Sequence, residues 1–500
     1  MSRILNKAAG IIAGVVVAAA VATTGGAWYT GTQLEPVLSS AIAQANRELA
    51  SSLARADGQP AMQLELLSLD RRVFSSTARY RIKLHDIAAQ GEQGSREWLL
   101  VDHIEHGPLP WSHVKALRLM PVMAASNFAL ERTADTDGWF AMSQAGSPLR
   151  VQVSLAYDGA SDTRLQLLAL STRGANATVE FSGLTARLLL NADATRYGLT
   201  GHSDALSADI PGQAGRVKAA FKGLSFDTGG TLGASGMYLG HSDLKLAQAS
   251  LQGTDVAPVR LESLSASGLM QEVGGNLDVQ ASYSLGALNY ADQPIGALQA
   301  SLKLARLDIL ASRELGELYR TVIAPQWQTP LPDGTLPPLR LSDAERQRLD
   351  AAVGKLLDAK PHLQLEKLSL ATEHGESVMS VETDLANPAP LLPGSPAYLA
   401  KLIARLQADL RLSKPMLADL GSLQASLQGQ TDPLRVAQAG RDLSATVAGL
   451  GQMLGLVKDE GEHVRASLHY SDAMVDFNGQ KMPLQQFAQV LGQLGAMRQR

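Results

Sequence analysis

The stretch Thr77-Ala-Arg-Tyr-Arg-Ile-Lys-Leu-His85 alternates strictly between apolar and polar side chains. The apolar positions are Ala78, Tyr80, Ile82 and Leu84, and the basic positions are Arg79, Arg81 and Lys83. A period of two predicts a half-buried β-strand, here the returning arm of a hairpin. We expect the basic side to be a solvated face, paired with Asp102 or Glu105 on a neighbouring strand. Contact with anionic lipid head groups is the alternative.

The heptad Gln63-Leu-Glu-Leu-Leu-Ser-Leu69 precedes this strand, and Gln364-Leu-Glu-Lys-Leu-Ser-Leu370 repeats it with one difference. An amphipathic helical pattern precedes each heptad, at residues 37–56 and 342–357. The leucines of both heptads change sides midway, which predicts a β-bulge or sharp twist at the same place. We interpret the two regions as an internal duplication of a helix-plus-hairpin module. Chance similarity in a leucine-rich chain is the alternative.

Residues 150–308 form a series of short alternating segments separated by glycine turns such as Gly229-Gly230 and Gly274-Gly275. This spacing predicts an antiparallel meander. Because aromatic residues are only 5% of the chain, a long, open sheet is favoured over a compact sandwich. The expected fold class is α+β and β-rich, with long antiparallel meander sheets, packed amphipathic helices and one N-terminal transmembrane helix.

Four regions are expected along the chain. Residues 1–33 are a membrane anchor or signal segment, residues 34–310 a helix plus extended antiparallel β region, and residues 311–360 a helical and proline-rich connector. Residues 361–500 form a second mixed α/β module with a closing helix. The patterns within that module predict helices at 396–406 and 415–456, an interruption near 429–433, strands at 464–470 and 474–477, a tight turn at 478–479 and a helix at 484–494.

The N-terminus carries a targeting signal. Arg3 and Lys7 precede residues 8–34, which contain no charged side chain. That length is sufficient for a membrane-spanning helix of about 20 residues, and the positive-inside rule keeps the two bases in the cytoplasm. The side chains expected at the membrane are Ile11, Ile12, Val15, Val16, Val17, Val21, Trp28 and Tyr29. A signal peptide cleaved after Ala20-Val-Ala22 is the alternative.

The composition excludes several classes of function. The chain has 44 basic and 48 acidic residues and a net charge of −4, so nucleic acid is not an expected partner. The absence of cysteine excludes thiolate catalysis, disulfides and cysteine-bound zinc. No nucleotide-binding, hydrolase or metalloprotease motif occurs, and no cofactor is expected.

The densest cluster of polar side chains able to bind metal or transfer protons lies at residues 102–113. It comprises Asp102, His103, Glu105, His106 and His113. On a strand, His103 and Glu105 share one face and Asp102 lies on the other. We expect a polar strand face followed by a turn histidine that bonds the backbone. A divalent metal held by His103, Glu105 and His113 is the alternative.

Two stretches carry a resemblance to a known family. They are Val73-Phe-Ser-Ser-Thr77 and His106-Gly-Pro-Leu-Pro-Trp-Ser112, with Pro121-Val122 downstream. They resemble the hallmark stretches of the YdgA-like family of bacterial proteins. The resemblance implies a Gram-negative inner-membrane or periplasmic protein and transfers no catalytic residue. The motif positions that we expect to form a structural turn are His106, Gly107, Pro108, Pro110, Trp111 and Ser112.

Three functions from different classes remain. The first is a membrane-anchored envelope scaffold or assembly factor, dimeric through the helices at 415–456, whose apolar side chains exceed what a solvated helix needs. The second is the binding of lipid, or of a lipid-bearing partner, in an apolar groove of the extended sheet. The third is an envelope hydrolase that uses His103, Glu105 or His106. The expected partners are the inner membrane, a lipid or envelope protein, and a second copy of the chain.

Overall fold

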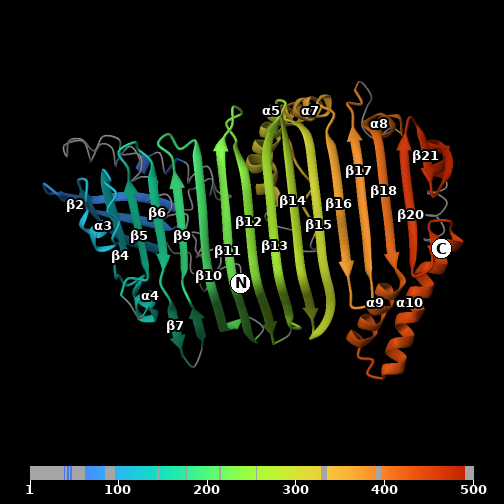
Figure 1. The fold of residues 1–500 in the computed structure, drawn as a ribbon, viewed down its shortest axis with the longest axis horizontal. Coiled ribbons are helices and arrows are strands. Elements are labelled where there is room, and N and C mark those ends of the chain that lie inside the picture. The colour runs from blue at the N-terminus through green and yellow to red at the C-terminus, as the bar shows by residue number, and fades with distance from the viewer. Residues whose placement is uncertain are drawn as a thin grey trace. The chain divides into compact units, whose positions relative to one another are not determined.

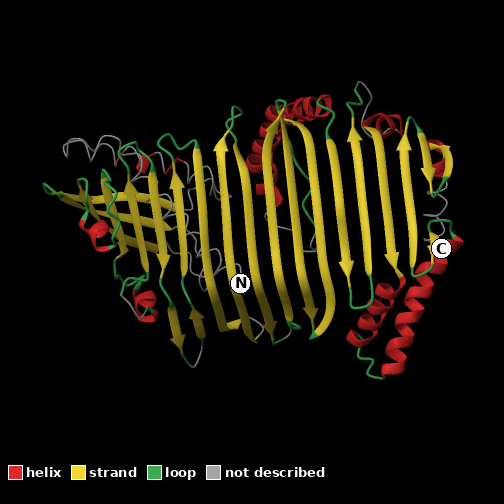
Figure 2. Cartoon of the chain, viewed as in Figure 1, coloured by secondary structure: helices red, strands yellow, loops and turns green. Residues whose placement is uncertain are grey.

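The computed structural model describes residues 39, 42–43, 46–47, 62–84, 96–143, 146–174, 177–212, 215–254, 256–327, 335–389 and 396–489. The chain divides into two compact units, Met1–Thr231 and Leu232–Arg500. Each is an antiparallel β meander with a few helices (Figures 1 and 2), so the β-rich class is confirmed. No helix of these residues has the length and apolar character needed to cross a bilayer. The predicted anchor at residues 1–33 lies outside the described residues.

The strands of the first unit follow one another in antiparallel pairs from β1 to β6, and then β9, β10 and β11 continue the sheet. β8 also pairs with β10, and β7 pairs with β8. The strands are β1 (Met62–Arg71), β2 (Ser75–Leu84), β3 (Arg96–His106), β4 (Ala124–Leu130), β5 (Leu149–Leu155), β6 (Ser161–Leu167), β7 (Leu170–Arg173), β8 (Thr178–Phe181), β9 (Leu184–Leu190), β10 (Arg196–Gly212) and β11 (Gly215–Leu232). Two helices with given bounds are α3 (Trp111–Lys115) and α4 (Asp137–Met142), and the described residues 39, 42–43 and 46–47 are also helical.

The core of the first unit is built from the apolar face predicted for β2. Tyr80 and Ile82 are buried in one cluster with Leu100 of β3 and Val151 of β5. Ile42, from the helical segment before β1, is buried in the same cluster. The predicted half-buried strand is therefore confirmed.

The basic face of β2 lies outside that core, as expected, but its partners were wrongly predicted. The ion pairs join Arg79 to Glu131, Arg81 to Glu65 and Glu97, and Lys83 to Glu65. Asp102 cannot take part, because it lies opposite Ala78 on the core side of the sheet. The ion pairs come instead from the hairpin partner β1, from β3 and from the end of β4.

A β-bulge interrupts each of the two related heptads. In β1 the register skips Leu67, so that Leu64, Leu66 and Leu69 all oppose the core side chains of β2. In β16 (His362–Ala371) the register against the preceding strand skips Glu366. The bulge reverses the alternation, so the leucines on its two sides lie on one face, whereas Leu67 itself is exposed in the bulge of β1. The prediction of a bulge in each heptad is confirmed, but the two bulges do not occupy the same position, because Leu67 is the fifth residue of its heptad and Glu366 is the third. The internal duplication stays a prediction.

The second unit is itself a meander that runs from β12 to β18 and then through β20, β21 and β22. β19 pairs with β20. Its remaining strands are β12 (Tyr238–Gly253), β13 (Val259–Val273), β14 (Asn276–Tyr290), β15 (Gln293–Asp308), β17 (Glu376–Leu385), β18 (Ile403–Ser413), β19 (Lys458–Glu460), β20 (His463–Ser471), β21 (Met474–Phe477) and β22 (Gln480–Pro483). Its helices with given bounds are α5 (Ile309–Leu318), the π-helical η1 (Tyr319–Ile323), α6 (Ala324–Trp327), α7 (Asp343–Asp358), α8 (Pro396–Leu402), α9 (Lys414–Leu427) and α10 (Pro433–Met453). The described residues 484–489 are also helical.

Most elements predicted for the C-terminal part are confirmed. Helices α9 and α10 occupy the predicted helical stretch with the break between them, and Asn478-Gly479 forms the turn between β21 and β22. The helix predicted at 396–406 was too long, because it ends at Leu402 and strand β18 follows. From Arg405 onward polar and apolar residues alternate, which is the period of a strand.

Candidate functional site

The structure does not bring the predicted polar cluster together around one point. Among the described residues, no three His, Asp or Glu side chains gather as metal ligands would. His103 faces outward, and its Nδ1 lies 3.4 Å from the Thr77 hydroxyl. His113 is buried and bonds Ser154, whereas Glu105 accepts hydrogen bonds from Ser112. The three candidate ligands therefore have separate partners.

The stretch from His106 to Ser112 forms the turn that leads from β3 into α3. The His106 imidazole bonds the Ser76 hydroxyl at 2.9 Å, a side chain rather than the expected backbone, and burial lowers the pKa of His106. Gly107 has a φ of 102°, which favours glycine. The carboxylate of Glu105 accepts hydrogen bonds from both the N–H and the hydroxyl of Ser112.

The prolines and the tryptophan of this motif complete the turn. The Pro108 carbonyl accepts from the Val122 N–H at 3.0 Å, and the Pro110 carbonyl accepts from the His113 N–H at 2.9 Å. Trp111 is exposed, and the Lys115 ammonium lies 5.5 Å from the centre of its ring. These contacts close residues 107–123 into a compact excursion between β3 and β4.

Asp102 lies inside the core of the first unit. Burial raises the pKa of its carboxyl group to about 8. The Ser126 hydroxyl and the Asn127 N–H lower that pKa in part, but neither makes a hydrogen bond of normal geometry to the carboxyl oxygens. At neutral pH the carboxyl group is therefore mostly protonated.

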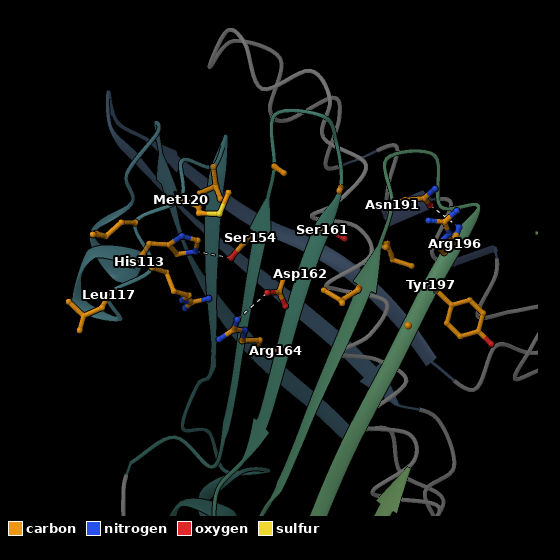
Figure 3. Close-up of a pocket in the computed structure, with 18 residues that line it drawn as sticks. His113, Leu117, Met120, Ser154, Ser161, Asp162, Arg164, Asn191, Arg196 and Tyr197 are labelled. Carbon is orange, nitrogen blue, oxygen red and sulfur yellow. Dashed lines mark hydrogen bonds and ion pairs between the residues drawn. The ribbon is translucent and has the colours of Figure 1, made fainter. Parts of the chain in front are cut away.

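A pocket of about 810 Å³ lies beside the excursion (Figure 3). We name it the edge pocket. Its walls are residues 113–122, the ends of β5 and β6, and the turn between β9 and β10. The His113 Nε2 and the Ser154 hydroxyl, both in the lining, are 2.7 Å apart. Figure 3 marks this contact with a dashed line. The other ring nitrogen of His113 has no hydrogen-bond partner among the described residues.

The edge pocket carries more positive than negative charge. Its charged lining residues are Arg118, Arg164, Arg196 and Asp162. The Asp162 carboxylate accepts from Arg164 at 3.2 Å and from Arg187 at 2.9 Å, which lowers the pKa of Asp162 despite its burial. Burial and the nearby Arg164 lower the pKa of Arg118, and burial and Arg118 lower that of His113. A compact anionic group fits this lining electrostatically.

Of the residues at this pocket, the sequence indicated only His113. Arg118 lies five residues later, but Asp162 and Arg164 come from a different hairpin. The pairing register of β4, β5 and β6 brings these side chains to one pocket, and no local sequence pattern predicts that register.

The sheet of the second unit has one apolar face and one polar face. Cross-strand pairing aligns one continuous row of apolar residues from β12 to β20: Leu244, Ala266, Tyr283, Ala300, Leu368, Met379, Leu410 and Ala466. Directly paired residues share a face, so this row and its parallel neighbours define what we call the apolar sheet face. A neighbouring row is Leu246, Leu264, Leu285, Leu298 and Leu370.

The opposite face of the same sheet is rich in serine. The pair Ser265 and Ser284 share a hydrogen bond of 2.7 Å, and Ser282 and Ser301 one of 3.5 Å. The centre of the apolar sheet face nevertheless remains open. Tyr283 is 50% exposed, and the leucines at 244, 298, 302 and 368 are all more than a third exposed.

Comparisons with known proteins identify the relatives of this chain. Protein YdgA of Escherichia coli K12 is 26% identical over 495 residues, covering 97% of this chain and 96% of the relative. Uncharacterized protein YihF of the same organism is 24% identical, covering 95% of this chain and 97% of the relative. An uncharacterized protein of Haemophilus influenzae is 24% identical over 37% of this chain.

No solved structure matches this chain. The family model for bacterial proteins of unknown function DUF945 matches residues 5–485. That range covers most of both units and includes the motifs at residues 73–77 and 106–112, so the resemblance inferred from those motifs is confirmed. The chain belongs to the DUF945 family of bacterial proteins, of which YdgA is a relative.

Proposed function

We propose that this protein is anchored in the bacterial inner membrane by one N-terminal helix, holds the bulk of its chain in the periplasm, and binds lipid along the apolar sheet face. The location rests on the two bases and the uncharged run at residues 3–34. The binding role rests on one observation, the open centre of the apolar sheet face at Tyr283, Leu298 and Leu302.

The physical argument is the cost of leaving that face in water. Burial of apolar surface contributes roughly 25 cal/mol per Å², and contiguous exposed apolar patches mark interaction sites. The apolar row crosses eight strands, so at about 4.8 Å per strand it is roughly 34 Å wide. One acyl chain spans about half of a ~30 Å hydrocarbon core and fits within that width.

Photo-crosslinking in living cells tests this function with the full chain. A photoreactive amino acid replaces Tyr283 or Leu298 on the apolar sheet face. Matched variants carry it at Ser282 or Gln299, which are exposed on the opposite face of the same strands. We expect lipid adducts, detected by intact-protein mass spectrometry, at Tyr283 and Leu298 only. Equal lipid adducts on both faces, or none at Tyr283 and Leu298, would contradict the proposed function.

A second candidate function, a dimeric scaffold, is favoured by the hairpin of α9 and α10. Leu434 and Met453 are 80% and 74% exposed, and Leu427 and Leu450 are also exposed. A photoreactive residue at Leu450 would then capture a second copy of the chain, and one at the polar Asp442 would not. A hydrolase finds no such support, since the described partners of His103, Glu105 and His106 do not form one site.

A further inference from the structure

Exposed apolar side chains of the first unit gather at one end of its strands, where the connections from β1 to β2, from β3 to β4 and from β5 to β6 lie. We name this end, formed by residues 72–74, 107–123 and 156–160, the docking edge. Its most exposed large apolar members are Val73, Phe74, Trp111, Leu117, Leu119, Met120 and Tyr157. Leu117 is 84% exposed, and Phe74 and Met120 are each 81% exposed. Among the described residues of this unit, only Leu67 and Leu189 are large, exposed and apolar elsewhere.

Backbone hydrogen bonds hold the segments of the docking edge side by side. The His106 N–H donates to the Phe74 carbonyl at 2.9 Å, and the Gly107 N–H donates to the Met123 carbonyl at 3.3 Å. The Met123 N–H in turn donates to the Leu155 carbonyl at 2.7 Å. The exposed side chains of the β1–β2 turn and of the excursion around α3 therefore belong to one surface.

The charge of this surface is basic. The docking edge contains three bases, Arg72, Lys115 and Arg118, and one acidic residue, Asp158. Apolar side chains flanked by bases, with an exposed tryptophan, are typical of protein surfaces that enter the interface of an anionic membrane. The edge pocket opens among the same residues, because Leu117, Leu119 and Met120 belong to its lining.

The polar floor of the edge pocket suits the head group of a lipid. His113 is 4% exposed, and its Nδ1 has no partner among the described residues. The Nε atoms of Arg118 and Arg164 are likewise buried without a partner there. Arg118 and Arg164 line the pocket together with the apolar side chains Leu117, Leu119 and Met120, and an amphiphile with an anionic head requires such a combination of cationic and apolar groups.

The chain also keeps the first unit close to the predicted anchor. The uncharged run ends at Leu34, and Ile42 is already buried in the core of the first unit. Asn46 then exchanges two hydrogen bonds of 2.8 Å with the backbone of Leu64. Eight residues span at most about 28 Å when fully extended. An anchored chain therefore holds this unit within reach of the bilayer surface.

We propose that the docking edge lies in the interface of an anionic bilayer, with the edge pocket around the anionic head group of one lipid. Apolar burial of the α3 excursion and attraction between its bases and the lipid both stabilise this state. The inference shares with the proposed function only the membrane location, and it adds a second contact with the membrane beyond the anchor.

Site-specific labelling of the full chain tests this inference, because the protein contains no cysteine and a single substitution gives a single label. Phe74→Cys and Leu117→Cys carry an environment-sensitive fluorophore at the docking edge. Ala134→Cys places the fluorophore at an exposed position after the other end of β4. The labelled chains are reconstituted into phosphatidylcholine vesicles with and without phosphatidylglycerol. Melting curves of the labelled chains verify that each variant folds.

In vesicles with phosphatidylglycerol we expect a blue-shifted emission, quenched by spin-labelled lipid, at positions 74 and 117 and not at 134. Lys115→Gln is expected to weaken docking roughly fivefold, as is Arg118→Gln. Water-like emission at Leu117 in these vesicles would overturn the docking. Equal signals without phosphatidylglycerol would overturn the anionic head-group site.

This readout is independent of the lipid adducts at Tyr283. Failure of the adducts with docking intact would remove only the proposed lipid-binding function. Loss of docking with adducts at Tyr283 intact would remove only this inference. A further experiment adds glycerophosphate to the protein in detergent and measures its melting temperature. A melting temperature that glycerophosphate raises, without docking to vesicles, would show a site for soluble anions and overturn the lipid assignment.

Discussion

Asp102 of β3 lies directly opposite Ala78 of β2, and neither side chain is exposed to solvent. An ionisable group thus occupies a position in the core where its neighbour has only a methyl group. The register leaves it no charged partner to compensate for burial, since its other cross-strand neighbour is Phe128. This relationship determines how the stability of the first unit responds to pH.

Asp102→Asn should remove a pH dependence of stability. The folded pKa of about 8 exceeds the unfolded value of about 3.9, so the folded state binds the proton more tightly. Stability is then highest below pH 4 with respect to this group and falls as pH rises toward 8, in total by on the order of 5 kcal/mol. Urea unfolding between pH 5 and pH 8 measures this slope. A wild-type slope equal to that of Asp102→Asn would contradict the assignment.

Gly440→Ala should destabilise the hairpin of α9 and α10. A Cβ at Gly440 would collide with the Ala418 carbonyl and the Ser422 hydroxyl across the helix crossing. Overpacking of this kind costs about 1–3 kcal/mol. Gly449→Ala in the same helix meets nothing within 4 Å and should stabilise by about 0.5–1 kcal/mol through helix propensity. Thermal unfolding distinguishes the two, and a stabilising Gly440→Ala would refute the close crossing.

Glu105→Ala should loosen the α3 excursion. Its carboxylate holds both polar groups of Ser112, and their loss costs about 1–2 kcal/mol. We expect faster hydrogen exchange at residues 108–118 and a lower melting temperature. Glu97→Ala is the control, because its ion pair with Arg81 is more exposed and contributes less than about 1 kcal/mol. Unchanged exchange in Glu105→Ala would show that the turn is held by other contacts.

His374 should titrate above its ordinary range. Its Nδ1 lies 2.8 Å from the Asp419 carboxylate, and this hydrogen bond raises the pKa of His374. Stability from the pair is present below pH 6.5 and is lost as pH rises through the raised pKa. Asp419→Asn should return the midpoint toward 6.5, as measured by NMR of labelled histidine, with His374→Gln identifying the signal. An unchanged midpoint would exclude Asp419 as the cause.

The sequence predicted the elements whose periodicity is local. The alternation at residues 77–85 identified β2 and its buried face, and the shifted leucines identified both bulges. The helix pair after Ser413 was visible in the same way. The predicted helix at 396–406 overlapped the first residues of β18, because the apolar residues around 399–406 also fit a helical spacing.

The candidate site was less accessible to prediction, because it depends on register. Asp102 shares a face with Trp98 and Leu100, a pattern that would have placed it in the core. The apolar sheet face arises from pairing over several strands, and the edge pocket from residues of separate hairpins. The neighbouring sequence does not predict that Leu117 and Met120 are exposed, because leucine and methionine also occupy buried positions.

The order of the meander has a consequence for how the chain acquires its structure. From β12 to β15 every strand pairs with the one before it through a short turn, so each contact closes only a small loop. Sheets built from sequential neighbours avoid the slow search that distant pairings impose. Each hairpin can therefore join the sheet in sequence order while the chain is being synthesised from its N-terminus. The pairing of β15 with β16 must wait for the 53 residues that separate Asp308 from His362, so it closes a far larger loop than the hairpins before it.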